Sequence, residues 1–104
     1  MGRIAYVDGR YLPIDTPAIC IEDRGYQFAD AIYEVWAVRD GKLIDSDGHY
    51  RRMARSLAEL KIERPMSDAA LGVILRQIVR RNRLSAGLVY LQISRGVALR
   101  DHPF

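Results

Sequence analysis

The chain is short of features that mark several common classes of protein. Cys20 is the single cysteine in 104 residues, so an internal disulfide is excluded. Its isoleucine neighbours indicate a buried thiol and not a nucleophile or a metal ligand. No apolar run approaches the roughly 18 residues of a membrane span, and no basic start precedes an apolar signal core. A cytoplasmic setting fits these properties best.

The short motifs of several enzyme classes are also missing. The sequence has no G-x-S-x-G, no H-E-x-x-H, no Walker loop, no G-x-G-x-x-G and no Cys/His spacing typical of a metal site. No residue set recognisable by spacing alone therefore supplies complete chemistry, and no metal site is expected.

Lysine is scarce although the chain is basic. Of 16 cationic residues only Lys42 and Lys61 are lysines, and the formal net charge is +3. Arginine is preferred where a planar, bidentate contact with carboxylate or phosphate matters. An arginine-rich coding bias explains the same composition, so composition alone does not identify a ligand.

The pattern of apolar and turn residues predicts one α+β domain over residues 1–104. Asp-Gly pairs at residues 8–9 and 40–41 are typical hairpin turns, and the run before Ser94 reads as a final strand. Apolar residues at helical spacing predict two consecutive helices between the second hairpin and this strand. We expect a mainly antiparallel sheet with both helices packed on one face. The expected strands are at 4–7, 10–12, 19–21, 32–38, 42–44 and 88–94. The first helix should begin near Asp45 to Asp47, whose side chains suit the first-turn amides, and Ser67 or Asp68 should cap the second.

The strand expected at residues 32–38 has apolar side chains on both of its faces. Alternation places Tyr33 and Val35 on one face, and Glu34 and Trp36 on the other. We therefore expect both faces to be covered. Glu34 is the unusual member of an otherwise apolar face.

Three groups of cations are candidate anion sites. His49 and Arg52 are three residues apart and share one side of the first helix, although such a pair is more often solvated. The arginines of residues 76–83 could contact nucleic acid. They cluster at a helix end without interleaved aromatic residues, which favours a solvated helix terminus.

The third group lies in the last residues of the chain. Arg100 and His102 are two apart, so in an extended segment both project to the same side. A guanidinium fork and an imidazole N–H can then hold one carboxylate from two directions. A frayed basic end is the alternative reading of the same residues.

Several blocks of the sequence resemble a known family. "DRGYQFADAIYEV", the helix start "HYRR" and the terminal "SRGVALRDHPF" are similar, in order and spacing, to the N-terminal part of class IV (fold type IV) aminotransferases, which use pyridoxal 5'-phosphate. The D-amino acid branch is the most similar. The resemblance extends over almost the whole chain and implies the N-terminal domain of a homodimeric transaminase.

The resemblance also implies roles for four residues. Arg52 matches the family's helix arginine that binds the cofactor phosphate. Tyr33 matches a tyrosine of the substrate pocket. Arg100 and His102 match the pair that, with this tyrosine, binds the substrate α-carboxylate and reaches the pocket of the other subunit. Branched-chain aminotransferases and aminodeoxychorismate lyases share the "DRG" and helix-arginine blocks and remain rivals, but they generally bind the carboxylate differently.

One part of the family pattern is missing. Transamination needs a lysine that forms a covalent link with the cofactor and then moves a proton. Neither Lys42 nor Lys61 matches that position, and the carboxylate for the pyridine nitrogen is missing too. We therefore expect an N-terminal portion of a longer enzyme that is inactive alone and retains no cofactor. A non-catalytic module that binds anions or a partner is the alternative from another class.

Overall fold

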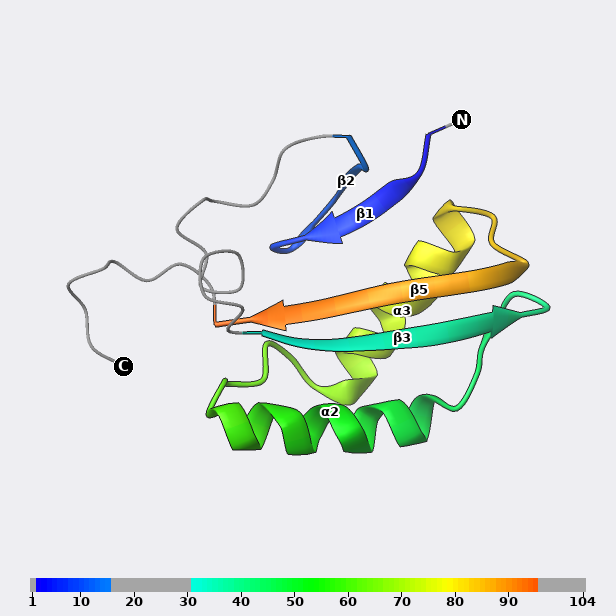
Figure 1. The fold of residues 1–104 in the computed structure, drawn as a ribbon. Coiled ribbons are helices and arrows are strands. Elements are labelled where there is room, and N and C mark those ends of the chain that lie inside the picture. The colour runs from blue at the N-terminus through cyan, green and yellow to red at the C-terminus, as the bar shows by residue number, and fades with distance from the viewer. Residues whose placement is uncertain (1, 16–30, 96–104) are drawn as a thin grey trace.

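Two small antiparallel sheets and two helices form the fold in a computed structural model that describes residues 2–15 and 31–95 (Figure 1). The hairpin of β1 and β2 is one sheet, and the other has the strand order β4-β3-β5. Both helices lie between β4 and β5 in the sequence, so the expected α+β class is confirmed. The elements are β1 (Ile4–Val7), β2 (Arg10–Pro13), β3 (Ala31–Arg39), β4 (Lys42–Leu43), α2 (Ser46–Leu60), α3 (Asp68–Arg81) and β5 (Ala86–Ser94).

The long pair of β3 and β5 is the centre of the fold. The two strands are antiparallel over their whole length, with Ala31 opposite Ser94 and Arg39 opposite Ala86. Asp40 and Gly41 form the turn to β4, and both have the positive φ that a tight hairpin requires. Both Asp-Gly hairpins predicted from the sequence are therefore confirmed.

The two helices cover the same face of the β3–β5 pair. Trp36 is fully buried on this face and packs in one cluster with Met53 and Leu57 of α2 and with Leu71 and Leu75 of α3. Burial of side chains of this size contributes roughly 1.5–3 kcal/mol each. The cluster fixes α2 against β3 and thereby sets the positions of the polar residues that the two elements share.

The opposite face of this sheet corrects one expectation. Tyr33 and Val35 of β3 are exposed, as are Leu88 and Tyr90 of β5. The expectation that both faces of the strand are covered is therefore wrong for the part of the chain that the structure describes. The expectation that both helices pack on one face of the sheet is correct, and it is this one-sided packing that leaves Tyr33 and Val35 exposed.

The helix ends differ in how they are capped. The Ser67 hydroxyl accepts a hydrogen bond from the Ala70 amide across 3.1 Å, which is the predicted N-cap of α3. Asp45 precedes α2 but makes no side-chain cap, because its own backbone is left-handed (φ 57°). The start of α2 was therefore predicted correctly, whereas the capping role of its aspartate was wrong.

Asn82, just beyond α3, joins the β1–β2 hairpin to the rest of the fold. Its Oδ1 accepts from the Ile4 amide across 2.8 Å, and its Nδ2 donates to the Ile4 carbonyl across 3.0 Å. The same Nδ2 donates to the Ile78 carbonyl at the end of the helix. The Arg81 guanidinium lies 4.0 Å from the centre of the Tyr11 ring and adds a cation–π contact to the hairpin.

Some sequence predictions lie outside the described residues. These are the short strand at 19–21, Cys20, and the terminal pair Arg100 and His102. Within the described ranges there is no helix long and apolar enough to cross a membrane. Nor do those ranges contain a group of three or more His, Cys, Asp or Glu side chains arranged to hold a metal ion.

Candidate functional site

Glu34 is a buried carboxylate on the covered face of β3. Only 8% of the residue is exposed, and its neighbours on this face, Ile32 and Trp36, are apolar core residues. A carboxylate in such a position needs hydrogen-bonding partners, because burial of an unpaired charge is costly. Its partners come from the adjacent helix.

His49 and Arg52 lie on the side of α2 that faces β3. His49 Nδ1 is 2.5 Å from Glu34 Oε1. Arg52 donates through Nη2 to Glu34 Oε1 across 3.1 Å and through Nε to Oε2 across 3.4 Å. The predicted pairing of His49 and Arg52 on one helix side is correct, and Glu34 is the group that brings them together.

The ionised carboxylate determines the proton positions in this cluster. Burial raises the pKa of Glu34, but hydrogen bonds from Arg52 and His49, together with their charges, lower it overall below its usual value. Since Glu34 is then an acceptor only, His49 Nδ1 must carry the proton of their shared hydrogen bond. The 2.9 Å approach of Arg52 Nη2 to that nitrogen is therefore a contact between two donors.

The imidazole of His49 is fixed from a second side. Its ring centre lies 4.4 Å from that of Trp36, and the two planes are inclined by 34°. Trp36 in turn donates from Nε1 to the Ser46 hydroxyl across 3.2 Å. His49 thus has its Nδ1 held by Glu34 and one ring face covered by a core residue, so its orientation is well determined.

Arg52 retains the capacity to bind an anion. Its side chain is 55% exposed, and Nη1 has no hydrogen bond to any described residue. The hydrogen bond to Glu34 and the charge of that carboxylate raise the pKa of Arg52, so the guanidinium stays charged. An arginine held on one edge and open on the other suits a phosphate group. The chemistry of this residue therefore fits the cofactor phosphate that the sequence resemblance implies.

Tyr33 lies beside Glu34 in β3 but points to the opposite, exposed face of the sheet. There its ring is 5.7 Å from that of Tyr90 in β5, with an interplanar angle of 47°. Alternation along one strand places Tyr33 and the Glu34 cluster on the two sides of the sheet. The structure thus brings Arg52 together with Glu34 and His49, and separates Tyr33 from them.

The structure places no other candidate residue in this cluster. Arg100 and His102 lie outside the described residues. Lys42 is in β4, and Lys61 is the left-handed C-cap of α2, so neither belongs to the Glu34 cluster. Sequence reasoning missed Glu34 as a site residue. The available signal was a single acidic residue on an apolar strand face, but its partners are 15 and 18 residues away in the sequence.

Comparisons with known proteins identify relatives of this chain. A D-alanine aminotransferase from Bacillus licheniformis is 40% identical over 97 residues, and one from Staphylococcus haemolyticus is 33% identical over 99 residues. These matches cover 93% and 95% of this chain but only 34% and 35% of the relatives. The chain therefore spans about a third of the length of the curated relatives it matches.

A similar fold occurs in a solved structure. The putative 4-amino-4-deoxychorismate lyase from Legionella pneumophila superposes with a TM-score of 0.76 at 25% identity, covering 84% of this chain and 32% of that one. The family model for amino-transferase class IV matches residues 31–104, which include β3, both helices and β5. The chain belongs to the class IV aminotransferase family.

Proposed function

We propose that the chain is the N-terminal domain, residues 1–104, of a pyridoxal-phosphate-dependent transaminase that moves an amino group between a D-amino acid and a 2-oxo acid. The D-alanine aminotransferases among its relatives support the reaction type. Family membership supports the cofactor. The parent enzyme acts as a homodimer in this proposal.

The observation that carries the proposal is the geometry of Arg52. Glu34 holds its Nε and Nη2, so the guanidinium has a fixed direction, while Nη1 has no hydrogen bond within the part of the chain that the structure describes. Because the guanidinium is already held in place, the Arg52 side chain loses little conformational entropy when it binds a phosphate. In this proposal Arg52 is one phosphate ligand, and the others come from protein outside these residues.

The substrate roles of the other residues form the second part of the proposal. Tyr33 offers a phenol on the exposed face of the sheet, and Arg100 and His102 offer a guanidinium and an imidazole to the α-carboxylate. Binding of the carboxylate orients the substrate Cα for proton transfer. The bound cofactor supplies the electron sink for that transfer. The catalytic lysine is supplied outside this chain.

The cofactor role is tested by Arg52→Ala in the full-length enzyme. Loss of a charge-assisted contact should weaken pyridoxal phosphate binding about tenfold or more, measured by equilibrium dialysis with the visible absorption of the cofactor. Arg51→Ala is the matched control, because Arg51 is an exposed neighbour on the same helix. Equal cofactor affinity in the Arg52→Ala and Arg51→Ala enzymes would contradict the assignment.

The substrate role is tested by Arg100→Ala in the same enzyme. We expect KM for the amino acid to rise far more than the dissociation constant of the cofactor. A comparable loss of both would remove Arg100 from the proposed carboxylate site.

A second activity within the family is favoured by one observation. The similarity of the fold to a putative 4-amino-4-deoxychorismate lyase makes a lyase reaction on the same cofactor the alternative. Assay of the full-length enzyme with D-alanine and a 2-oxo acid, and separately with aminodeoxychorismate, distinguishes the two. Turnover of aminodeoxychorismate without transamination of D-alanine would replace our proposal.

A further inference from the structure

A hollow lined by several cationic side chains lies beside the β3–β4 turn, close to the start of α2. Its volume is about 700 Å³, and it is bounded by the β3–β4 turn, the start of α2 and the second half of α3. Four of the residues that line it are cationic, namely Lys42, Arg76, Arg80 and Arg83. Asp40 is the single acidic residue in the lining. The Glu34 cluster does not line it.

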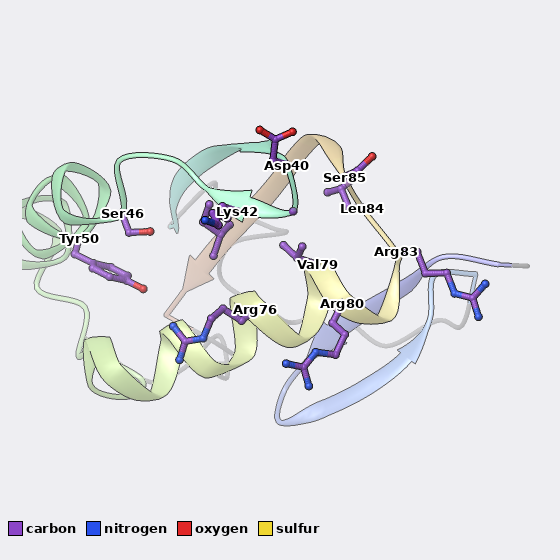
Figure 2. A pocket seen from close by; sticks show the side chains of 12 residues that line it. Asp40, Lys42, Ser46, Tyr50, Arg76, Val79, Arg80, Arg83, Leu84 and Ser85 are labelled. Atoms are coloured by element: carbon purple, nitrogen blue, oxygen red, sulfur yellow. The ribbon is translucent and has the colours of Figure 1, made fainter.

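Donor groups from three elements surround the same part of this hollow. Figure 2 shows the hydroxyls of Ser46 and Tyr50 directed into it from α2, with Lys42 of β4 above and Arg76 of α3 below. Arg80 and Arg83 extend away from this space at the rim (Figure 2). The central four side chains include no carboxylate.

The two hydroxyls are set up to donate. The Ser46 oxygen already accepts from Trp36 Nε1, so its own hydrogen remains for another partner. Tyr50 is half-buried, and burial together with the charge of Asp68 raises its pKa although Arg76 lowers it. The phenol therefore keeps its proton near neutral pH.

Gly72 explains how Tyr50 and Arg76 come close together. A Cβ at Gly72 would lie 3.2 Å from the Tyr50 hydroxyl and 3.1 Å from Arg76 Nη1. Both polar groups thus lie over a residue without a side chain. The hydroxyl of one helix and the guanidinium of the next are thereby brought to one place.

The cations are not neutralised within the described part of the chain. None of the four cationic side chains that line the hollow has an ion pair with a described carboxylate. The helix dipole favours Arg80, in the last turn of α3, but its effect falls off within one turn and does not reach Arg76. Arg76 and Arg80 are four residues apart, a spacing at which like charges destabilise a helix. An anion in the hollow would reduce this repulsion.

We propose that this hollow, lined centrally by Lys42, Ser46, Tyr50 and Arg76, binds a phosphate-bearing small molecule at a site separate from Arg52. The lysine, the guanidinium and the two hydroxyls hold the phosphate oxygens. Leu43, Val79 and Leu84 also line the hollow and accommodate an organic part of the ligand. Its volume is within the range of small-molecule sites in proteins.

Calorimetric titration of the 104-residue chain with inorganic pyrophosphate at constant ionic strength tests the site. We expect saturable 1:1 binding, and a dissociation constant at least tenfold higher in the double variant Lys42→Gln/Arg76→Gln. Arg51→Gln/Arg55→Gln is the matched control, because it removes the same charge from the exposed side of α2. Equal weakening in both double variants, or no saturable binding in the unsubstituted chain, would overturn the proposal.

Two further measurements separate this site from the rest of the molecule. Tyr50→Phe retains the charge and removes one donor, so it should weaken pyrophosphate binding severalfold. Lys42→Gln/Arg76→Gln in the full-length enzyme should leave the affinity for pyridoxal phosphate unchanged, so failure of the cofactor proposal and failure of this one give different results. Melting curves check that each variant is folded, and amide shifts at Gly41 and Ser46 on titration report binding in the unsubstituted chain independently.

Discussion

Glu34 Oε1 on β3 accepts a hydrogen bond from Arg52 Nη2 on α2 across 3.1 Å. This ion pair connects the sheet to the helix at the proposed site for the cofactor phosphate. The carboxylate end is buried and the guanidinium end is half-exposed. Glu34 therefore contributes to the packing of the fold, whereas Arg52 is accessible to a ligand. Exposed ion pairs contribute little to stability, but loss of the partner of a buried carboxylate costs more.

Glu34 should make folding stability depend on pH. Its pKa is lower in the folded chain than the usual 4.5, so the ionised carboxylate stabilises the folded state above that value. This stabilisation is lost as the pH falls through the folded-state pKa. Glu34→Gln should cost about 1–2 kcal/mol at pH 7, and the difference from the unsubstituted chain should shrink below pH 4.5. Urea unfolding between pH 7 and pH 3 measures both effects.

The difference in the free energy of unfolding between the unsubstituted chain and Glu34→Gln should depend on pH. A difference that stays constant over this pH range would show that Glu34 is not the titrating group. All other side chains are common to the two proteins, so their contributions cancel in the comparison. His49→Ala is a second test of the same pH dependence, because it removes one of the two hydrogen-bond donors that lower the pKa of Glu34.

Asn82→Asp should loosen the β1–β2 hairpin without unfolding the main sheet. The substitution replaces the amide donor with a carboxylate that faces the Ile4 and Ile78 carbonyls, which it repels. Amides of β1 and β2 should then exchange with solvent at least about tenfold faster, a loss comparable to one hydrogen bond.

Hydrogen exchange followed by NMR resolves the hairpin from β3 and β5. Amides at Val35 and Val89 serve as internal controls, because both belong to the strand pair covered by the helices. Uniformly faster exchange over all strands would mean that Asn82 stabilises the whole fold and not the hairpin alone.

Leu57 and Leu60 of α2 offer a matched test of the core. Leu57 is buried against β3, whereas Leu60 is 42% exposed. Leu57→Ala should lower the free energy of unfolding by about 2–5 kcal/mol, and Leu60→Ala by less than about 1 kcal/mol. The substitution is the same in both variants, so the larger loss at Leu57 in urea unfolding reports its burial in the core. Similar losses in both variants would contradict the packing of α2 seen here.

Much of the fold followed from local sequence signals. Asp40 and Gly41 predicted their hairpin because a two-residue turn requires positive φ at both positions. Ser67 predicted the start of α3 because its hydroxyl can cap the first turn. Asp45 misled the same reasoning, since a left-handed backbone at that position prevents its side chain from capping.

The site depended on contacts that local signals do not contain. His49 and Arg52 could be placed on one helix side from their spacing, but their common partner, Glu34, belongs to another element. Which face of β3 would be covered depended on the direction in which both helices pack. Tyr33 was therefore predicted as a pocket residue only by family resemblance, and its exposed position is known from the structure alone.

The exposed face of the β3–β5 pair should cause the isolated chain to self-associate. Val35, Leu88 and Tyr90 lie side by side on this face, and Leu88 is 70% exposed. Contiguous apolar surface of this kind commonly marks an interface. Leu88→Lys should shift the chain toward monomer in sedimentation velocity at high concentration. Val73→Lys is the matched control, because Val73 is an exposed apolar residue on α3, away from this face. A monomeric unsubstituted chain, or the same shift from both variants, would show that this face does not drive association.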